Sequence, residues 1–476
     1  MTESNSNNEQ ENNLPAGWVW SSLEDCVEIL DSQRIPINAT ERAQGIERKS
    51  KDERYPYYGA TGQVGWIDDF IFDEELLLLG EDGAPFLEST KDKAYIIRGK
   101  SWVNNHAHVL RAISGLTTNH YLMHYLNYAD YHDFVTGTTR LKLNQSRMRK
   151  IPIPLAPFSE QERMVAKIEK LFSQLDAGIV ELDRIQANLA RYKASVLKAA
   201  CEGRLVPTEA EMARAEGRDY ESGEELLQRI LVERKKKWKE EKRVKGKDPS
   251  KMKYQEPEAP DTEGLPELPE GWVWARVGQI SHTIQYGTSE KANLDPSGIP
   301  VLRMGNIQDG NIDFGNLKYL SYETPKLNVL LLDPGDILFN RTNSAELVGK
   351  TAVYKSTHPE ATFASYLIRV KACDSYLPEL VSYYINSFYG RKYIAAVVSQ
   401  QVGQANVNGT KLANMPIIVP PLDEQIRVVA ELERRLSIIE ELETAVKANL
   451  TRAERVRQAI LKRAFEGKLM QQKSNR

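Results

Sequence analysis

The sequence is poor in cysteine. Its 476 residues include only three, Cys26, Cys201 and Cys373. They lie far apart and lack the close spacing of zinc ligands, so the pattern predicts neither a disulfide framework nor a metal site. We expect three reduced, buried thiols.

Long hydrophobic runs are also missing. The longest apolar stretches, near Leu76–Leu79 and Val329–Leu332, are far too short to span a bilayer. Residues 1–13 are polar and acidic and lack the apolar core of a signal peptide. We therefore expect a cytoplasmic protein with no membrane association.

The motifs of nucleotide-dependent enzymes are absent as well. The chain has no G-x-x-x-x-G-K-[ST] loop for ATP and no Asn-Pro-Pro-aromatic motif, with which a DNA adenine methyltransferase holds its flipped base. His106 and His108 would need further ligands to hold a metal, and none is evident nearby. Glu81 and Asp82 stand between glycines, which is typical of a loop. We expect no catalytic centre, and no cofactor or metal bound by this chain.

An overall basic charge is missing too, but one segment is strongly basic. The net charge is −3, so any contact with nucleic acid must be local. From Arg229 to Lys253 there are 12 Lys or Arg against 4 Asp or Glu, a local net charge of 12 − 4 = +8. Two interpretations stay open for this segment. It is either a solvated linker helix or a contact for phosphates or a partner protein.

What the chain does contain is a tandem repeat. Three phrases occur twice: LPAGWVW at 14–20 and LPEGWVW at 268–274; IPIPLAPFSEQ at 151–161 and MPIIVPPLDEQ at 415–425; EGRL at 202–205 and EGKL at 466–469. The first phrase repeats after 268 − 14 = 254 residues, and the other two after 415 − 151 = 466 − 202 = 264 residues. The chain is therefore two half-molecules, and the second globular segment is ten residues longer. Apart from their opening phrase, the two globular segments show little resemblance.

Each half ends in a long helix with an apolar seam. In the first copy the seam positions alternate by three and four residues: 168, 171, 175, 178, 182, 185, 189, 192 and 196. Only Gly178 interrupts this heptad pattern of a coiled coil. Adding 264 gives the seam of the second copy: Leu432, Ile439, Leu442, Val446, Val456 and Ile460, with Arg435, Asn449 and Ala453 as weaker members. Two helices of about 44 residues, each roughly 66 Å long, most simply bury each other's seam.

The ends of both helices are marked by residues that favour caps. Ser159 and Asp423 are the predicted N-caps, and Glu162 would complete a capping box with Ser159. Gly203 and Gly467 stand where a left-handed C-terminal cap needs no side chain.

Short strand-like runs, glycine turns and short helices alternate in both globular segments, at 14–152 and 268–416. The predicted fold class is α+β: two globular α/β domains separated by two long antiparallel coiled-coil helices, in a pseudo-twofold tandem repeat. The remaining parts are a disordered tail at 1–13, a central helix at 153–205, a charged linker with a basic helix at 206–267, a C-terminal helix at 417–470 and a tail at 471–476.

Side chains suited to base edges gather before each long helix and within the second segment. Arg pairs with guanine, and Asn or Gln with adenine, through two hydrogen bonds each. The candidates for DNA contact are Arg140, Lys142, Asn144, Gln145 and Arg147 in the first segment, and Arg303, Asn306, Arg341, Asn343, Gln401, Gln404, Asn406, Asn408 and Lys411 in the second. The alternative is that they belong to polar loops with ordinary capping roles.

The repeated phrases, together with the stretches at 299–307 and 335–350, resemble the specificity subunit of type I restriction-modification enzymes. The resemblance covers nearly the whole chain. It implies that the two globular segments are target-recognition domains, held apart by the helices, which read a bipartite, asymmetric site in double-stranded DNA.

The same resemblance implies a subunit without catalytic activity that works inside a complex. Two methyltransferase (modification) subunits would be carried to the DNA, and restriction (translocase and endonuclease) subunits would join them for ATP-dependent cleavage. S-adenosylmethionine, ATP and Mg²⁺ would belong to those partners.

Three other functions were weighed. A nuclease or methyltransferase acting alone is disfavoured by the missing cofactor motifs. A specificity subunit of a methylation-only complex is not distinguished by the sequence. A purely structural coiled-coil scaffold leaves the divergent polar segments unexplained.

Overall fold

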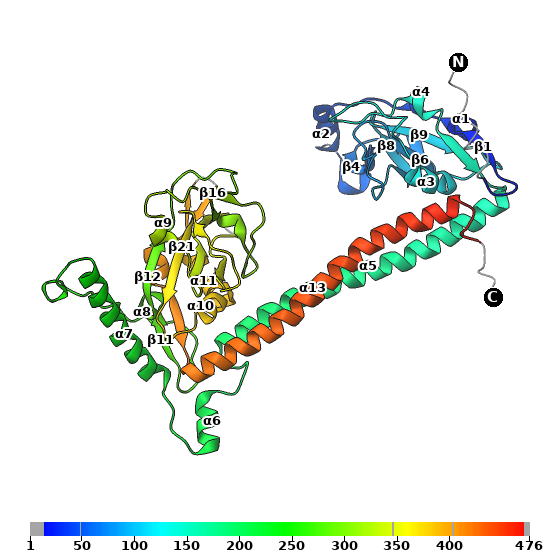
Figure 1. Ribbon diagram of the computed structural model, residues 1–476. Helices are drawn as coiled ribbons and strands as arrows, with labels where there is room; N and C mark the ends of the chain where they lie inside the picture. Colours follow the sequence, from blue (N-terminus) through cyan, green and yellow to red (C-terminus); the bar gives the residue numbers. More distant parts are fainter. Residues whose placement is uncertain (1–13, 48, 345–346, 402–403, 471–476) are drawn as a thin grey trace. The chain divides into compact units, whose positions relative to one another are not determined.

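The computed structural model describes residues 14–47, 49–344, 347–401 and 404–470, so both predicted tails lie outside the described residues. The chain divides into two units. Unit 1 combines the first part of the chain, up to Ile185, with its end, from Thr444; unit 2 is Gln186–Glu443. Two helices of 44 residues, α5 (Phe158–Cys201) and α13 (Leu422–Phe465), each contribute to both units (Figure 1).

Unit 1 is built on two sheets. The first has four strands in the order β2 (Val27–Ile29), β9 (Ala107–Ala112), β6 (Leu76–Gly80) and β7 (Ala94–Ile97). The second has the order β4 (Gly62–Ile67), β3 (Tyr55–Gly59), β8 (Lys100–Val103) and β5 (Phe72–Asp73). Strand β3 pairs antiparallel with β4 and parallel with β8. Helix α3 (Asn119–Tyr128) covers β6 and β7.

Unit 2 repeats this topology. Its first sheet has the order β12 (Ser281–Tyr286), β21 (Leu367–Ala372), β17 (Ile337–Asn340) and β19 (Thr351–Val353). Its second has the order β16 (Lys318–Leu320), β13 (Ile299–Leu302) and β20 (Thr362–Phe363). Strand β13 pairs antiparallel with β16 and parallel with β20, as β3 does with β4 and β8. Two segments with little sequence resemblance therefore form one scaffold, and the predicted α+β tandem fold is confirmed.

Shorter elements complete the two units. The remaining helices are α1 (Leu23–Cys26), α2 (Ala39–Glu47), α4 (Gln145–Met148), α6 (Glu209–Glu216), α7 (Gly223–Val244), α8 (Val277–Ile280), α9 (Leu327–Leu330), α10 (Pro378–Asn386), α11 (Phe388–Val397) and α12 (Gly409–Ala413). Helix α10 covers β17 and β19 and corresponds to α3. Further short strands are β14 (Ile307–Gln308) and β15 (Asn311–Ile312), which pair with each other.

The repeated phrases build equivalent joints in the two units. Strand β1 (Val19–Ser22) pairs with β10 (Pro152–Leu155) from Val19↔Leu155 to Ser22↔Pro152. Strand β11 (Val273–Arg276) pairs with β24 (Pro416–Val419) in the same register, from Val273↔Val419. Each pair places the opening phrase of a half beside the strand that leads into its own long helix.

The end of each long helix packs against the opening phrase of the other half. Gly467, after α13, lies so close to Pro15 that an added Cβ would collide with the proline ring, and Gly203, after α5, lies in the same way against Pro269. Both glycines have positive φ, +65° at Gly203 and +69° at Gly467, as predicted for C-terminal caps. The N-terminal and C-terminal ends of the described chain therefore meet in unit 1, and the helix ends run antiparallel in each unit.

Two predictions about the long helices need correction. Helix α5 begins at Phe158, so Ser159 lies inside its first turn and is not the N-cap; Pro157 O accepts the N–H groups of Glu160 and Gln161 at 2.8 and 3.0 Å in that place. Asp423 likewise lies inside α13, which begins at Leu422. Proline supplies a free carbonyl but no N–H, so it serves as the last residue before the helix.

The apolar seam is narrower than predicted. One position in each heptad is covered, as at Ile168, Leu189 and Val196 of α5 and at Leu432, Ile439, Val446 and Ala453 of α13. The other position is largely exposed, with 43% of Ile185, 48% of Tyr192 and 47% of Leu442 accessible. Along their middle the two helices therefore pack less closely than a regular two-stranded coiled coil, in which one partner helix covers both columns.

No helix among the described residues is both long enough and apolar enough to cross a membrane.

The joint between α3 and α5 in unit 1 contains an unusual buried histidine. His124 is 4% exposed, its ring stands edge-on to Phe172 at 5.6 Å between centroids, and its Nε2 has no hydrogen-bond partner. Burial lowers the pKa of His124 to about 4, and the nearby charges of His120 and Arg457 act in the same direction. The side chain is therefore neutral in the folded protein at neutral pH.

We expect substitutions at the helix caps to destabilise the fold. Gly203→Ala and Gly467→Ala force a Cβ into the left-handed region and against a proline ring, so each should lower the free energy of unfolding by about 2–3 kcal/mol. Gly178→Ala is the matched control, because Gly178 lies within α5 and an added Cβ would meet open space. This substitution should stabilise the fold by up to about 1 kcal/mol. Urea unfolding of the full chain measures this; equal behaviour of all three variants would contradict it.

The pH dependence of unit 1 follows from His124. The pKa of the His124 side chain is near 6.5 in the unfolded chain and about 4 in the folded protein. Between these two pH values the unfolded state therefore binds a proton at this residue and the folded state does not. Stability should fall by about 2 kcal/mol between pH 7 and pH 5 through this group. His124→Phe keeps the ring contact and removes the titration, so the loss over that range should shrink accordingly in chemical unfolding curves. An unchanged pH profile would show that His124 is not the cause.

Candidate nucleic-acid interface

Each unit extends a short β-arm from its first sheet, and the two arms carry many of the predicted DNA-contacting residues. Arm 1 comprises residues 136–143, in which Thr136 and Lys142 form a bridge, and Lys142 also bridges Asp82 just after β6. Arm 2 comprises residues 399–401 and 404–407, where β22 (Ser399–Gln401) pairs with β23 (Gln404–Asn406). Strand β23 also pairs with β18 (Thr342–Asn343), just after β17. The two arms therefore attach to equivalent strands.

Hydrogen bonds fix the correspondence residue by residue. The Leu143 N–H donates to Glu81 O at 2.8 Å, and the Val407 N–H donates to Arg341 O at 2.9 Å. These positions differ by 407 − 143 = 264, the spacing of the long helices. By this shift Arg140 corresponds to Gln404, Lys142 to Asn406, Asn144 to Asn408 and Arg147 to Lys411. Equivalent places on one scaffold thus carry different hydrogen-bonding side chains.

Two of the predicted DNA-contacting residues, Arg140 and Lys142, are exposed cations on arm 1. The Arg140 Nε lies 2.8 Å from a carboxylate oxygen of Asp82, and the Lys142 ammonium lies 3.5 Å from Glu81. Both cations thus face carboxylates on the rim of unit 1.

The three other candidates follow the arm at the start of α4. The Gln145 amide donates inward to Asp31 at 3.0 Å, which makes it an anchor of the arm. The Arg147 guanidinium donates to the carbonyl of Asp133 at 3.3 Å. Asn144 caps α4 by position, is exposed and has no side-chain capping bond.

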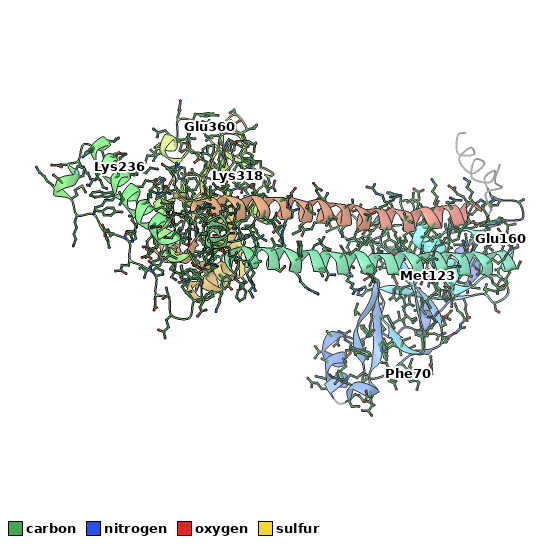
Figure 2. All side chains as sticks on the ribbon, turned by 90° about the horizontal axis from the view of Figure 1, so that it is seen from below. Phe70, Met123, Glu160, Lys236, Lys318 and Glu360 are labelled. Carbon is green, nitrogen blue, oxygen red and sulfur yellow. The ribbon has the colours of Figure 1, made fainter. Side chains whose placement is uncertain are left out.

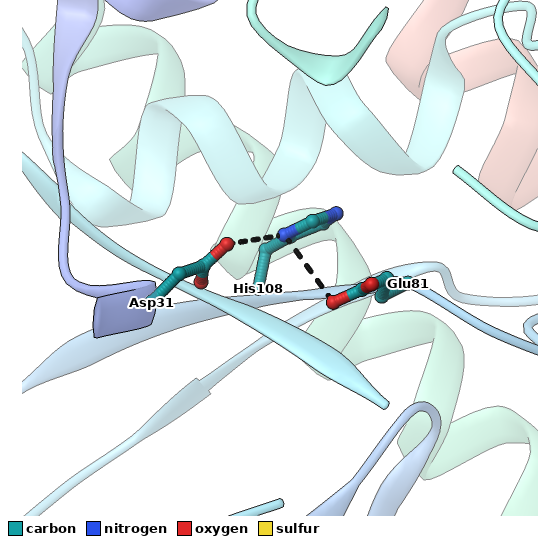
Figure 3. A group of neighbouring side chains, drawn as sticks. All are labelled: Asp31, Glu81 and His108. Atoms are coloured by element: carbon teal, nitrogen blue, oxygen red, sulfur yellow. Dashed lines mark hydrogen bonds and ion pairs between the residues drawn. The ribbon is translucent and has the colours of Figure 1, made fainter. Parts of the chain in front are cut away.

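A buried charged network lies beneath arm 1 (Figure 3). His108 is fully buried, its Nδ1 lies 2.6 Å from Asp31 and its Nε2 lies 2.8 Å from the carbonyl of Leu143 in the arm. Burial would raise the pKa of Asp31, but the hydrogen bond and charge of His108, the Val109 N–H and the charge of Arg34 outweigh it and hold that pKa below its usual range. Both ring nitrogens of His108 thus lie within hydrogen-bond distance of oxygen atoms, one in the core of unit 1 and one in the arm.

This network also has the composition of a metal site. Ligand atoms of Asp31, Glu81 and His108 lie within 4.8 Å of one another. Neither neighbour of His108 is evident from the sequence, because Asp31 and Glu81 lie 77 and 27 positions away. Arg34 already neutralises the carboxylates, with its guanidinium 2.9 Å from Glu81 and 3.4 Å from Asp31, and it donates to Ala107 O at 2.7 Å. The group therefore acts as an internal salt-bridge network that anchors arm 1.

Arm 2 is anchored by different chemistry. The Tyr286 hydroxyl, at the end of β12, accepts the Gly409 N–H at 2.7 Å, and the Arg341 guanidinium stacks over the Tyr286 ring at 4.8 Å. The side chain of Asn408 caps α12 by accepting the Lys411 N–H at 2.9 Å. Neither Tyr286 nor Asp31 was recognised from the sequence; the sole sign of Tyr286 is an aromatic residue before a glycine.

The remaining candidates of unit 2 are placed as follows. Asn306 is buried and its amide is used within its own loop, accepting from Arg303 N at 2.9 Å and donating to Asp313 O at 2.8 Å and Gly315 O at 3.0 Å. Its role is to shape the loop. Arg303 also donates to the carbonyl of Asn316.

The last predicted DNA-contacting residues of unit 2 lie in arm 2 or next to it. Asn343 is half-buried beside the arm, and the Oδ1 of Asn406 is buried without a partner. The Lys411 ammonium donates to Ser399. The side chains of Gln401 and Gln404 lie outside the described residues.

We expect Asp31→Asn to loosen arm 1, because the neutral amide cannot hold His108, Gln145 and Arg34 together. Trypsin cleavage at Arg140 and Lys142 should then be several times faster than in the wild-type chain. The wild-type arm should itself loosen as the pH falls below about 4, because a carboxylate with a lowered pKa stabilises the fold only while it is ionised. Asp130→Asn, at an exposed residue paired with His132, is the control that should leave the cleavage rate unchanged. Equal rates in both variants would refute the anchoring role.

The geometry defines a class of protein: two copies of one scaffold, each offering a polar arm with its own side chains, joined by two long helices. Residues 15–182 and 269–452 match the family described as the type I restriction modification DNA specificity domain. Because these regions make up most of the chain, it belongs to this family, and the resemblance found in the sequence is confirmed. Members supply the DNA specificity of restriction-modification systems and are not their catalytic components.

Individual relatives are distant. The chain is 25% identical over 324 residues to the type I restriction enzyme EcoKI specificity subunit of Escherichia coli K12, covering 68% of this chain and 58% of that protein. It is 23% identical over 358 residues to the StySPI specificity subunit of Salmonella potsdam, covering 74% of this chain and 66% of that protein. The matches thus span about three-fifths to two-thirds of these relatives.

One solved structure shows the same fold along the chain. It comes from work on the assembly and conformational transition of the type I R-M system, and it covers 96% of this chain and 99% of its own, with a TM-score of 0.58 and 18% sequence identity.

Proposed function

We propose that this chain is the specificity subunit of a type I restriction-modification complex and reads a bipartite, asymmetric site in double-stranded DNA, one half-site through each unit. The observation that carries this proposal is the matched pair of arms. An identical scaffold bearing Arg140 and Lys142 in one copy, and Gln404 and Asn406 in the other, is suited to reading two different base sequences. The long helices would keep the gap between half-sites constant in length and free in sequence.

The proposed complex contains two methyltransferase subunits, one per half, because the equivalent joints present equivalent surfaces twice. Restriction subunits would join this core. S-adenosylmethionine, ATP and Mg²⁺ are assigned to those partners, and the chain itself would bind no cofactor. The cytoplasm, where the host DNA lies, is the proposed location.

A methylation-only complex is the second candidate, since the same recognition geometry serves it equally. Native mass spectrometry of the chain co-expressed with its methyltransferase should show two copies of that subunit per chain. Mapping of methylated adenines in host DNA, with and without the gene, tests the recognition role, and cleavage of unmodified DNA separates the two candidates.

Exchanging residues 14–152 for those of a relative with a different site should change one half-site and leave the other half-site and the gap intact. The double variant Arg140→Ala with Lys142→Ala should affect the same half-site. It should weaken binding by about 1–3 kcal/mol at the half-site of unit 1 and leave the half-site of unit 2 unaffected. Asn406→Ala is the matched variant for unit 2. Competition binding with oligonucleotides altered in one half-site at a time measures both, and loss of discrimination at both half-sites from one variant would contradict modular reading.

A further inference from the structure

Helix α7 lies between the two family matches, in a stretch that neither match covers. Its first half belongs to the core of unit 2: Leu226, Leu227 and Ile230 are buried, and the helix contacts α8, β11, β12 and β24. This part of the predicted linker is therefore a fixed element of unit 2. The second half of α7 extends the same rigid helix beyond that core.

Some cations of the second half hold α7 in place. The Arg234 guanidinium donates from Nε to Ser281 O at 2.9 Å. The Lys237 ammonium lies 2.7 Å from Asp374, and Lys235 lies 3.0 Å from Glu256. These three side chains serve the internal structure of unit 2.

Three other cations face solvent with no ion pair among the described residues. Lys236 (labelled in Figure 2), Lys239 and Arg243 are all exposed. Their spacing of three and four residues puts them on one face of the helix, opposite the face of Leu227 and Ile230. We name Lys236, Lys239 and Arg243 the outer basic face.

We propose that the outer basic face of α7 binds the phosphate backbone of DNA beside the half-site that unit 2 reads. The proposal rests on the proposed function. The segment from Arg229 to Lys253 carries +8, so the rest of the chain carries −3 − 8 = −11. A DNA-reading protein with that balance needs a local source of positive charge, because phosphate contacts supply much of the affinity for DNA.

The composition of the face favours DNA over an acidic protein. Protein interfaces centre on buried aromatic or aliphatic anchors within a polar rim. The aromatic rings of this region are used internally: Trp238 and Tyr254 stand edge to face at 5.2 Å, and Tyr254 lies against Arg234. Apart from exposed Val232, the side chains on this face are polar or charged. Such a face suits a polyanion bound through counterion release.

The place of α7 determines what it contributes. Arg234 attaches to the Ser281 end of β12, whereas arm 2 attaches to the Tyr286 end. The two ends of β12 are roughly 16 Å apart at about 3.3 Å per residue. The outer basic face would therefore not contact the same DNA bases as arm 2. Its contacts would add affinity without sequence preference, as phosphate contacts do.

The test uses the full chain assembled with its methyltransferase subunits. In the neutral variant Lys236→Gln, Lys239→Gln and Arg243→Gln are combined; in the matched variant Lys236→Arg, Lys239→Arg and Arg243→Lys keep the charge. The binding constant for a duplex carrying the recognised site is measured from low to moderate salt. The slope of log K against log salt should become shallower by about 0.9 for each lost phosphate contact, about 2–3 in total, in the neutral variant alone. The ratio of specific to non-specific binding should stay the same.

Three results would overturn the inference. The first is a wild-type slope in the neutral variant. The second is an altered ratio of specific to non-specific binding, which would place the face on bases. The third is failure of the neutral variant to retain its methyltransferase subunits while the matched variant retains them, which would make the face a protein contact. Failure of the proposed function is a separate outcome, recognised when the wild-type complex itself shows no site preference.

Discussion

The contact of each helix end with the opening phrase of the other half holds this architecture together. Gly467 against Pro15 and Gly203 against Pro269 bring together segments that are distant in sequence. Without a side chain, each glycine both turns the chain at positive φ and admits the proline ring. Because the contact occurs twice in the same form, each unit combines the opening segment of one half with the helix end of the other half.

The residues that stabilise the fold are separate from the residues proposed to read DNA. The sheets, the β1–β10 and β11–β24 joints and the helix caps are equivalent in the two units, while the arms differ. Arm 1 is anchored by a buried network of Asp31, His108 and Arg34, and arm 2 by Tyr286 with Arg341. Side chains at the tips can therefore change without altering the fold, since the anchoring groups lie below the arms.

The strongest basic charge of the chain is concentrated outside the two recognition segments. The two recognition segments and their long helices, residues 14–205 and 268–470, carry no net charge, with 47 Lys or Arg against 47 Asp or Glu. On arm 1 the exposed cations face carboxylates, as Arg140 does with Asp82. A group of cations without ion pairs among the described residues lies on α7, in the stretch between the two family matches.

The sequence by itself determined the tandem repeat, the presence of both long helices and the glycine caps, because helical periodicity and cap residues are local signals. The predicted N-caps, Ser159 and Asp423, lie one residue inside the observed helices. It also located the arms, through polar residues at equivalent positions. It did not reveal that the two globular segments share one topology, because strand pairing depends on contacts between distant residues that tolerate many sequences. Nor did it show that Gln145 and Asn306 are internal anchors, or that Asp31 and Glu81 flank His108. Those roles follow from partners up to 114 positions away, such as Asp31 for Gln145, and only the tertiary structure brings them together.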